Sequence, residues 1–217
     1  PAIAIIKHAN PCGVAENADI NLRIGGKGEA LILLHGYPQT HACWHKMAPI
    51  LIENFTVIIP DLRGYGDSIG PDPDIDNQLY SKRAMARDIE HVLNDLSIEV
   101  ASVVGHDRGG RVAYRFALDH PDRIRKLIVL DIIPTSEMWE KMTAQAFISG
   151  YHWQFLAQPN GLPEYMIGLD SERYLRHTLD SWAKIENSFS TPAMTEYLRC
   201  FSKASVIASC CADYRAG

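Results

Sequence analysis

The chain has 217 residues, 47% of them hydrophobic and 22% charged, which is ordinary for a globular protein with one core. Its formal net charge of −5 argues against nucleic acid and acidic membrane surfaces as partners, and no apolar run reaches the roughly 20 residues that span a bilayer. The start, Pro1–Cys12, lacks a secretory signal pattern, and the five cysteines form no Cys-x-x-Cys pair. We therefore expect a cytoplasmic protein with free thiols, no membrane contact and no metal or other cofactor.

Apolar runs and helical spacing alternate along the first part of the chain. The later apolar runs are continuous, as is typical of strands in a parallel sheet that is covered on both faces. Strands are predicted at Asn21–Ile24, Ala30–His35, Phe55–Pro60, Ala101–Gly105 and Lys126–Asp131, and helices at Ala42–Glu53, Ser81–Leu96 and Arg108–His120. This alternation predicts an α/β fold with right-handed crossovers and a site at the carboxyl ends of the strands.

Strand patterns end after Pro134. Residues 135–203 have the spacing of several helices, with breaks near Pro159, Pro163 and Pro192. Val206–Cys210 is short and fits either a strand or the end of a helix.

These patterns predict three parts. Residues 1–17 form an N-terminal extension, residues 18–134 form the N-terminal part of the core, and residues 135–217 form a helical cap. Without returning strands after the cap, Lys126–Asp131 becomes an apolar, unpaired sheet edge, which favours aggregation.

The segment Gly105–Gly109 (GHDRG) lies between a predicted strand and a predicted helix. A strand that turns sharply into a helix between glycines is the nucleophile elbow of α/β-hydrolases, here with Asp107 where esterases have serine. A carboxylate in this position attacks the carbon of an alkyl halide or an epoxide and forms an ester. The alternative role of Asp107, a helix N-cap, does not require the flanking glycines.

Two further turns resemble hydrolase motifs. His35–Pro38 (HGYP) follows a strand, so the backbone amides of Tyr37 and Arg108 are candidates for an oxyanion hole, although a Gly-Pro turn alone is common. Gly66–Gly70 (GDSIG) matches the serine-hydrolase pattern, but no helix follows it. We therefore reject Ser68 as a nucleophile.

Charged residues near the elbow suggest an anionic ligand. Arg108 and Arg111 lie three residues apart at a helix start, where the macrodipole disfavours cations, so a bound carboxylate is a better explanation than solvation. Asp131 either ends its strand in a plain turn or orients a catalytic histidine. His152, Trp153 and Tyr214 are either structural or N–H and O–H donors to a halide.

With these motifs in place, residues from about 20 to 217 resemble the fluoroacetate (haloacetate) dehalogenases of the α/β-hydrolase superfamily. The matching stretches are Leu34–His41, Asp61–Gly66, Gly105–Arg111, Leu130–Ile132, Tyr151–Trp153 and Asp213–Gly217. The resemblance implies that Asp107 displaces the halide, that Arg108 and Arg111 hold the substrate carboxylate, and that His152, Trp153 and Tyr214 stabilise the leaving halide. A histidine paired with Asp131 would then activate water to hydrolyse the ester.

The chain departs from this family at both ends. The family's catalytic histidine follows the last strand, beyond residue 217, so we expect a C-terminally truncated form that stalls at the ester. Residues 5–15 resemble instead the K-H-A-N-P-C-G motif of the bifunctional formyltransferase/cyclohydrolase of purine biosynthesis, a segment too short to carry that function.

Two alternatives stay open. An epoxide hydrolase shares the aspartate elbow but needs two cap tyrosines and has an aromatic residue after the aspartate, where this chain has Arg108. A non-catalytic ligand-binding domain is compatible with the missing base. The expected partner is a small haloacid, and a homodimer stays open.

Overall fold

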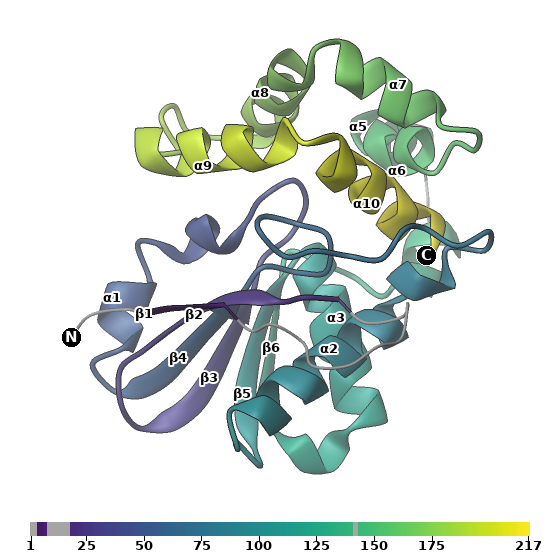
Figure 1. Ribbon diagram of the computed structural model, residues 1–217. Helices are drawn as coiled ribbons and strands as arrows, with labels where there is room; N and C mark the ends of the chain where they lie inside the picture. The colour runs from purple at the N-terminus through teal and green to yellow at the C-terminus, as the bar shows by residue number, and fades with distance from the viewer. Residues whose placement is uncertain (1–3, 8–17, 141–142) are drawn as a thin grey trace.

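The computed structural model describes residues 4–7, 18–140 and 143–217 (Figure 1). Its centre is a six-stranded sheet in the order β1-β2-β4-β3-β5-β6. The strands are β1 (Ala4–Lys7), β2 (Asn21–Gly25), β3 (Glu29–Leu34), β4 (Phe55–Pro60), β5 (Ala101–His106) and β6 (Ile124–Leu130). β3 to β6 pair in parallel, whereas β1 and β2 are antiparallel additions at one side. The predicted α/β class is confirmed, and each of the five predicted strands is found within two residues of its predicted bounds.

Both faces of the sheet are covered, which explains the continuous apolar runs. Ile32 and Leu34 of β3 face the cluster formed by α2 (Lys82–Asp95) and α3 (Arg108–Asp119). Leu31 and Leu33 face the opposite cluster, which contains Trp44 and the short helix α1 (Ala48–Leu51). α2 begins where sequence predicts, because the Ser81 side chain accepts a hydrogen bond from the Ala84 amide.

The predicted helix Ala42–Glu53 is wrong in extent. The structure has a 3-10 helix, η1 (His41–Trp44), then a turn, then α1. Pro49 lies in the first turn of α1. A proline is tolerated there because its missing N–H has no helical partner, but it would break a helix that continued from Ala42.

Seven α-helices follow β6 in the described residues, and α5 to α10 lie above the sheet in Figure 1. They are α4 (Thr135–Glu140), α5 (Ala144–Ser149), α6 (Tyr151–Leu156), α7 (Leu162–Leu169), α8 (Ser171–Trp182), α9 (Thr191–Phe201) and α10 (Ala204–Arg215). Pro163 and Pro192 lie in the first turns of α7 and α9, and Pro159 lies between α6 and α7, so the predicted breaks are confirmed. Val206–Cys210 belongs to α10 and is helical, which decides between the two alternatives. Within the described ranges, no helix combines the length and apolarity needed to cross a bilayer.

The apolar sheet edge predicted at Lys126–Asp131 is confirmed. β6 ends the strand order and pairs with β5 alone among the described strands. Ile128 is 50% exposed, and Leu127, Val129 and Leu130 are also exposed. An open edge with this composition offers unpaired N–H and C=O groups to another strand.

We predict that Ile128→Lys lowers the aggregation of this chain. A lysine adds charge to the edge at a residue that is already half exposed. Light scattering against protein concentration checks the prediction, with Ile75→Lys, a change at a fully exposed loop residue, as the matched control. Equal aggregation of the two variants would contradict an edge-driven process.

Candidate active site

Asp107 lies in a strained turn between β5 and α3. Its backbone has φ 50 and ψ −118, a conformation that L-residues rarely adopt. A Cβ on Gly105 would lie 2.4 Å from the Gly109 oxygen, and a Cβ on Gly109 would lie 2.3 Å from the His35 oxygen. Both glycines are therefore required by close backbone approach, as expected of an elbow. The Asp107 side chain makes no capping hydrogen bond, which disfavours the N-cap alternative.

The turn after β3 lies directly against this aspartate. The Tyr37 amide donates a hydrogen bond of 2.8 Å to Asp107 Oδ1. A Cβ on Gly36 would lie 2.6 Å from the same oxygen. The amide is thus fixed at a carboxylate oxygen, where negative charge develops when an ester of Asp107 is attacked.

A cavity of about 670 Å³ opens over Asp107. It is lined from the core by residues that follow β3, β5 and β6, including Tyr37, Asp107, Arg111 and Asp131. The helical layer contributes His152 and Trp153 from α6, and Leu179 and Trp182 from α8. Residues that the sequence could only propose separately are therefore brought together at the carboxyl ends of the parallel strands.

Arg108 and Tyr214 form part of the wall rather than the lining. The Arg108 guanidinium carbon lies 4.1 Å from the centroid of the Tyr214 ring. The Tyr214 ring centroid lies 5.7 Å from that of His152 and 5.2 Å from that of Tyr37. The sequence proposed seven residues as nucleophile, oxyanion group or substrate contact. Each of them lines this cavity or packs against its wall: Tyr37, Asp107, Arg108, Arg111, His152, Trp153 and Tyr214.

Unpaired donors concentrate at this place. Among the described residues, six buried side-chain polar atoms lack a hydrogen-bond partner. Four of them are Arg108 Nη1, Arg111 Nε, His152 Nδ1 and the Tyr214 hydroxyl. A buried donor without a partner costs about 1–3 kcal/mol, so a cluster of four such groups makes this region the candidate ligand site of the described structure.

Each arginine is only partly free, which the sequence did not show. Arg108 donates through Nε and Nη2 to the Asp213 carboxylate, at 2.9 and 2.8 Å. Arg111 Nη1 donates to the Ile133 carbonyl and the Thr135 hydroxyl, at 3.1 and 2.7 Å. The two cations are therefore held by the protein on one side and keep donors on the other.

His152 and Tyr214 are neutral donors. Burial lowers the pKa of His152 to about 4 and outweighs the attraction of Asp107. Burial and the nearby Asp107 carboxylate raise the pKa of Tyr214 well above its usual value. At neutral pH both groups can donate hydrogen bonds without carrying charge.

Asp131 lines the cavity but is exposed, and its backbone φ is 54. In the described part of the chain, no hydrogen bond joins a histidine to it. Ser68 is buried, donates to the Asp61 carbonyl at 2.7 Å and accepts from the Asn21 amide at 2.9 Å. Its hydroxyl links the loop after β4 to the start of β2, in agreement with its rejection as a nucleophile.

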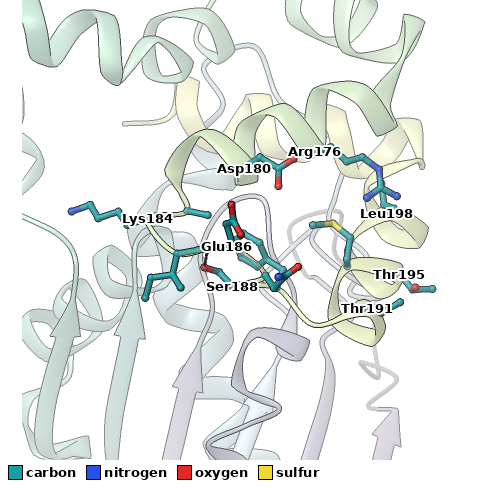
Figure 2. A pocket seen from close by; sticks show the side chains of 13 residues that line it. Arg176, Asp180, Lys184, Glu186, Ser188, Thr191, Thr195 and Leu198 are labelled. Atoms are coloured by element: carbon teal, nitrogen blue, oxygen red, sulfur yellow. Dashed lines mark hydrogen bonds between the residues drawn. The ribbon is translucent and has the colours of Figure 1, made fainter.

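A second cavity of about 620 Å³ lies between α8 and α9 (Figure 2). Its wall mixes cations and carboxylates, such as Arg176, Lys184, Asp180 and Glu186. None of the unpartnered buried donors of the described structure lines it. The cavity over Asp107 is therefore the better candidate for chemistry.

We predict that Gly36→Ala destabilises the fold by about 1–3 kcal/mol, because the new methyl group overlaps the Asp107 carboxylate. Gly168→Ala is the matched control, since Gly168 lies inside α7 and a Cβ there meets nothing within 4 Å. That change should stabilise the protein by about 0.5–1 kcal/mol. Urea unfolding measures both, and equal effects would contradict the close approach at Asp107.

A second prediction concerns pH. The folded state keeps His152 neutral down to a pKa of about 4, whereas the unfolded chain protonates it near 6.5. The folded state thus binds fewer protons in this window, so the free energy of unfolding falls as the pH drops from 6.5 to 4, by at most about 3 kcal/mol from this group. His152→Gln should remove this contribution, and His177→Gln, at an exposed residue of α8, should retain it. Parallel stability–pH curves for wild type and His152→Gln would refute the assignment.

Comparisons with known proteins agree with this geometry. The family profile described as alpha/beta hydrolase fold matches residues 29–210. A fluoroacetate dehalogenase from Burkholderia sp is 43% identical over 199 residues, covering 91% of this chain and 66% of the relative. A soluble epoxide hydrolase from Corynebacterium sp. (strain C12) is 37% identical over 199 residues, covering 88% of this chain and 66% of the relative. An alpha/beta hydrolase structure from Nostoc sp PCC 7120 has a TM-score of 0.94 at 48% identity, over 99% of this chain and 72% of that one.

The chain thus spans about two thirds of the length of these curated relatives. The comparisons lend no support to the formyltransferase/cyclohydrolase resemblance, and residues 8–15 of that stretch lie outside the described residues. The aspartate elbow, the parallel sheet and the match over residues 29–210 lead to one conclusion. The chain belongs to the α/β hydrolase fold family.

Proposed function

We propose that this chain carries the substrate site of a haloacetate dehalogenase. An Asp107 carboxylate oxygen attacks the α-carbon of the haloacid, a carbon–oxygen bond forms, and the carbon–halogen bond breaks with its electron pair leaving on the halide. The product of this step is an ester of Asp107. The observation that carries the proposal is the set of four unpartnered donors around a carboxylate nucleophile.

The two guanidinium groups support an anionic substrate. Arg108 Nη1 and Arg111 Nε are buried and unpaired, and a carboxylate is the anion that such donors bind best. Attraction to a negative substrate is strengthened because Arg108 is fully buried, in a region of low dielectric. A neutral substrate would gain little from these two cations.

The neutral donors support a departing halide. His152 Nδ1 and the Tyr214 hydroxyl are both unpaired, and the Trp153 ring packs against Tyr214 with a centroid distance of 5.6 Å. Fluoride leaves carbon poorly unless it is hydrogen-bonded as charge develops on it. Donors already fixed in place stabilise that transition state more than the ground state.

Hydrolysis of the ester is the second half of the proposal. The Tyr37 amide, which already bonds Asp107 Oδ1, and the neighbouring Arg108 amide would hold the oxyanion. Asp131 would orient a histidine base. Since no histidine bonds to Asp131 in the described part of the chain, we expect ester hydrolysis to be slow in these 217 residues.

Epoxide hydrolysis is the second candidate, because a soluble epoxide hydrolase is among the relatives. That reaction requires two tyrosine hydroxyls on the cap to protonate the epoxide oxygen. Within the described residues, Tyr214 has the one buried tyrosine hydroxyl without a partner, while Tyr174 shares its hydroxyl with that of Tyr37 at 3.3 Å. The donor set therefore favours the haloacid.

The same proposal assigns the parts of the chain. Residues 18–134 would form the catalytic core, and residues 135–217 the cap that closes the site from above. The small haloacid is the proposed partner of the site. A non-catalytic binding role would use the same cavity without forming the ester.

We predict that fluoroacetate adds one carboxymethyl group to Asp107 in stoichiometric amount. Mass spectrometry of the intact chain and of its peptides locates the adduct, and Asp107→Asn, which lacks the nucleophile, should give none. Labelling by styrene oxide without labelling by fluoroacetate would favour the epoxide hydrolase. Absence of any adduct, with fluoroacetate binding intact, would favour the binding domain.

A further inference from the structure

A fully buried carboxylate lies behind the proposed site and lines neither of the two cavities described above. Asp213, on α10, has no exposed surface. It accepts hydrogen bonds on one oxygen from Arg108 Nη2 and Lys82 Nζ, and on the other from Arg108 Nε and the Tyr65 hydroxyl. Its backbone carbonyl also accepts from Arg108 Nη2, at 2.5 Å. Every oxygen of this residue is occupied, so Asp213 is not available to a substrate.

These contacts define the orientation of the Arg108 guanidinium. The Nε and Nη2 edge faces Asp213 in a fork of two hydrogen bonds, and the Tyr214 ring lies on the guanidinium face at 4.1 Å. Two consecutive residues of α10 thus hold the edge and the face of one arginine. The group left over is Nη1, the unpartnered donor.

The arginine needs such an anchor. Arg108 begins α3, where the helix macrodipole disfavours a cation, and burial removes its hydration. The nearby Asp213 carboxylate outweighs burial and raises the pKa of Arg108, while Arg108 and Lys82 hold the pKa of Asp213 below its usual range. The charged fork is therefore stable. Because the fork is rigid, it restricts the direction of the remaining donor, Nη1, more than a freely rotating side chain would.

We propose that Asp213 is a positioning residue, which orients Arg108 Nη1 toward the substrate carboxylate and thereby makes the cap helix α10 part of the anion site. The inference rests on the proposed function, since it assigns a ligand to Nη1. It goes beyond that function because the residue touches no substrate. By the same inference, the Lys82 ammonium of α2 and the Tyr65 hydroxyl help to position Arg108, because they bond the same Asp213 carboxylate.

Two other roles for Asp213 predict different effects of its removal on anion binding. If Asp213 acted through charge alone, its removal would leave a more positive site and tighten anion binding. If it only stabilised the fold, binding by the folded fraction would not change. A positioning role predicts weaker binding in spite of the more positive charge.

The test measures single-turnover alkylation of Asp107 by fluoroacetate, which separates the half-saturating concentration from the maximal rate. Asp213→Asn should raise the half-saturating concentration by about tenfold or more, and Asp213→Glu, which restores the carboxylate, should recover part of the loss. Asp88→Asn is the matched control. It breaks a buried fork of the same kind, in which Arg63 Nε and Nη2 bond Asp88 at 2.8 and 2.6 Å, away from the cavity.

Asp88→Asn should lower Tm as Asp213→Asn does but leave the half-saturating concentration within about twofold. If Asp213→Asn does not fold, Tyr65→Phe decides, because it removes the 2.7 Å bond to Asp213 but leaves the carboxylate in place, and it should raise the half-saturating concentration about two- to fivefold. An unchanged or lowered value in the folded variant would overturn the positioning role. Arg108→Met tests the proposed function separately: if it leaves the half-saturating concentration unchanged, Arg108 binds no carboxylate.

Discussion

The strained turn at Asp107 determines where everything else in the site can lie. Its backbone has a positive φ, and three glycines allow neighbouring segments to approach it at distances that a methyl group would prevent. Such a conformation persists only where surrounding structure holds it in place. Here the support is the parallel sheet, because β3, β5 and β6 place three loops at one edge and β3 delivers the Tyr37 amide to the carboxylate.

Charged donors and neutral donors come from different elements around this turn. The helix that follows the turn supplies two guanidinium groups, whereas the helical layer supplies an imidazole and a phenol that burial keeps neutral. Cations attract and align an anion, and neutral donors are suited to charge that appears only during reaction. The proposed haloacid function rests on this division rather than on overall similarity, since relatives of both kinds match the chain.

The two layers of the molecule depend on each other through buried polar contacts. Asp213 of the helical layer bonds Arg108 of α3, Lys82 of α2 and Tyr65 of the loop after β4. Buried ion pairs of this kind are costly to break and geometrically specific. Helix α10 therefore packs on the core in one fixed position. That position also fixes the geometry of the site between the two layers.

The amino-acid sequence by itself determined the local features: the strands, the helix starts at Ser81 and Arg108, and the glycine-flanked aspartate. Their signals lie within a few neighbouring residues, as periodicity, capping and turn chemistry require. The prediction from sequence was wrong where one residue outweighed the periodic pattern, as Pro49 does in the predicted helix Ala42–Glu53. Only the tertiary structure decided which donors are free, because Arg108 and Asp213 are 105 residues apart and no local pattern links them. Pairing across such a distance depends on how α10 docks on α3, and that is a property of packing rather than of sequence spacing.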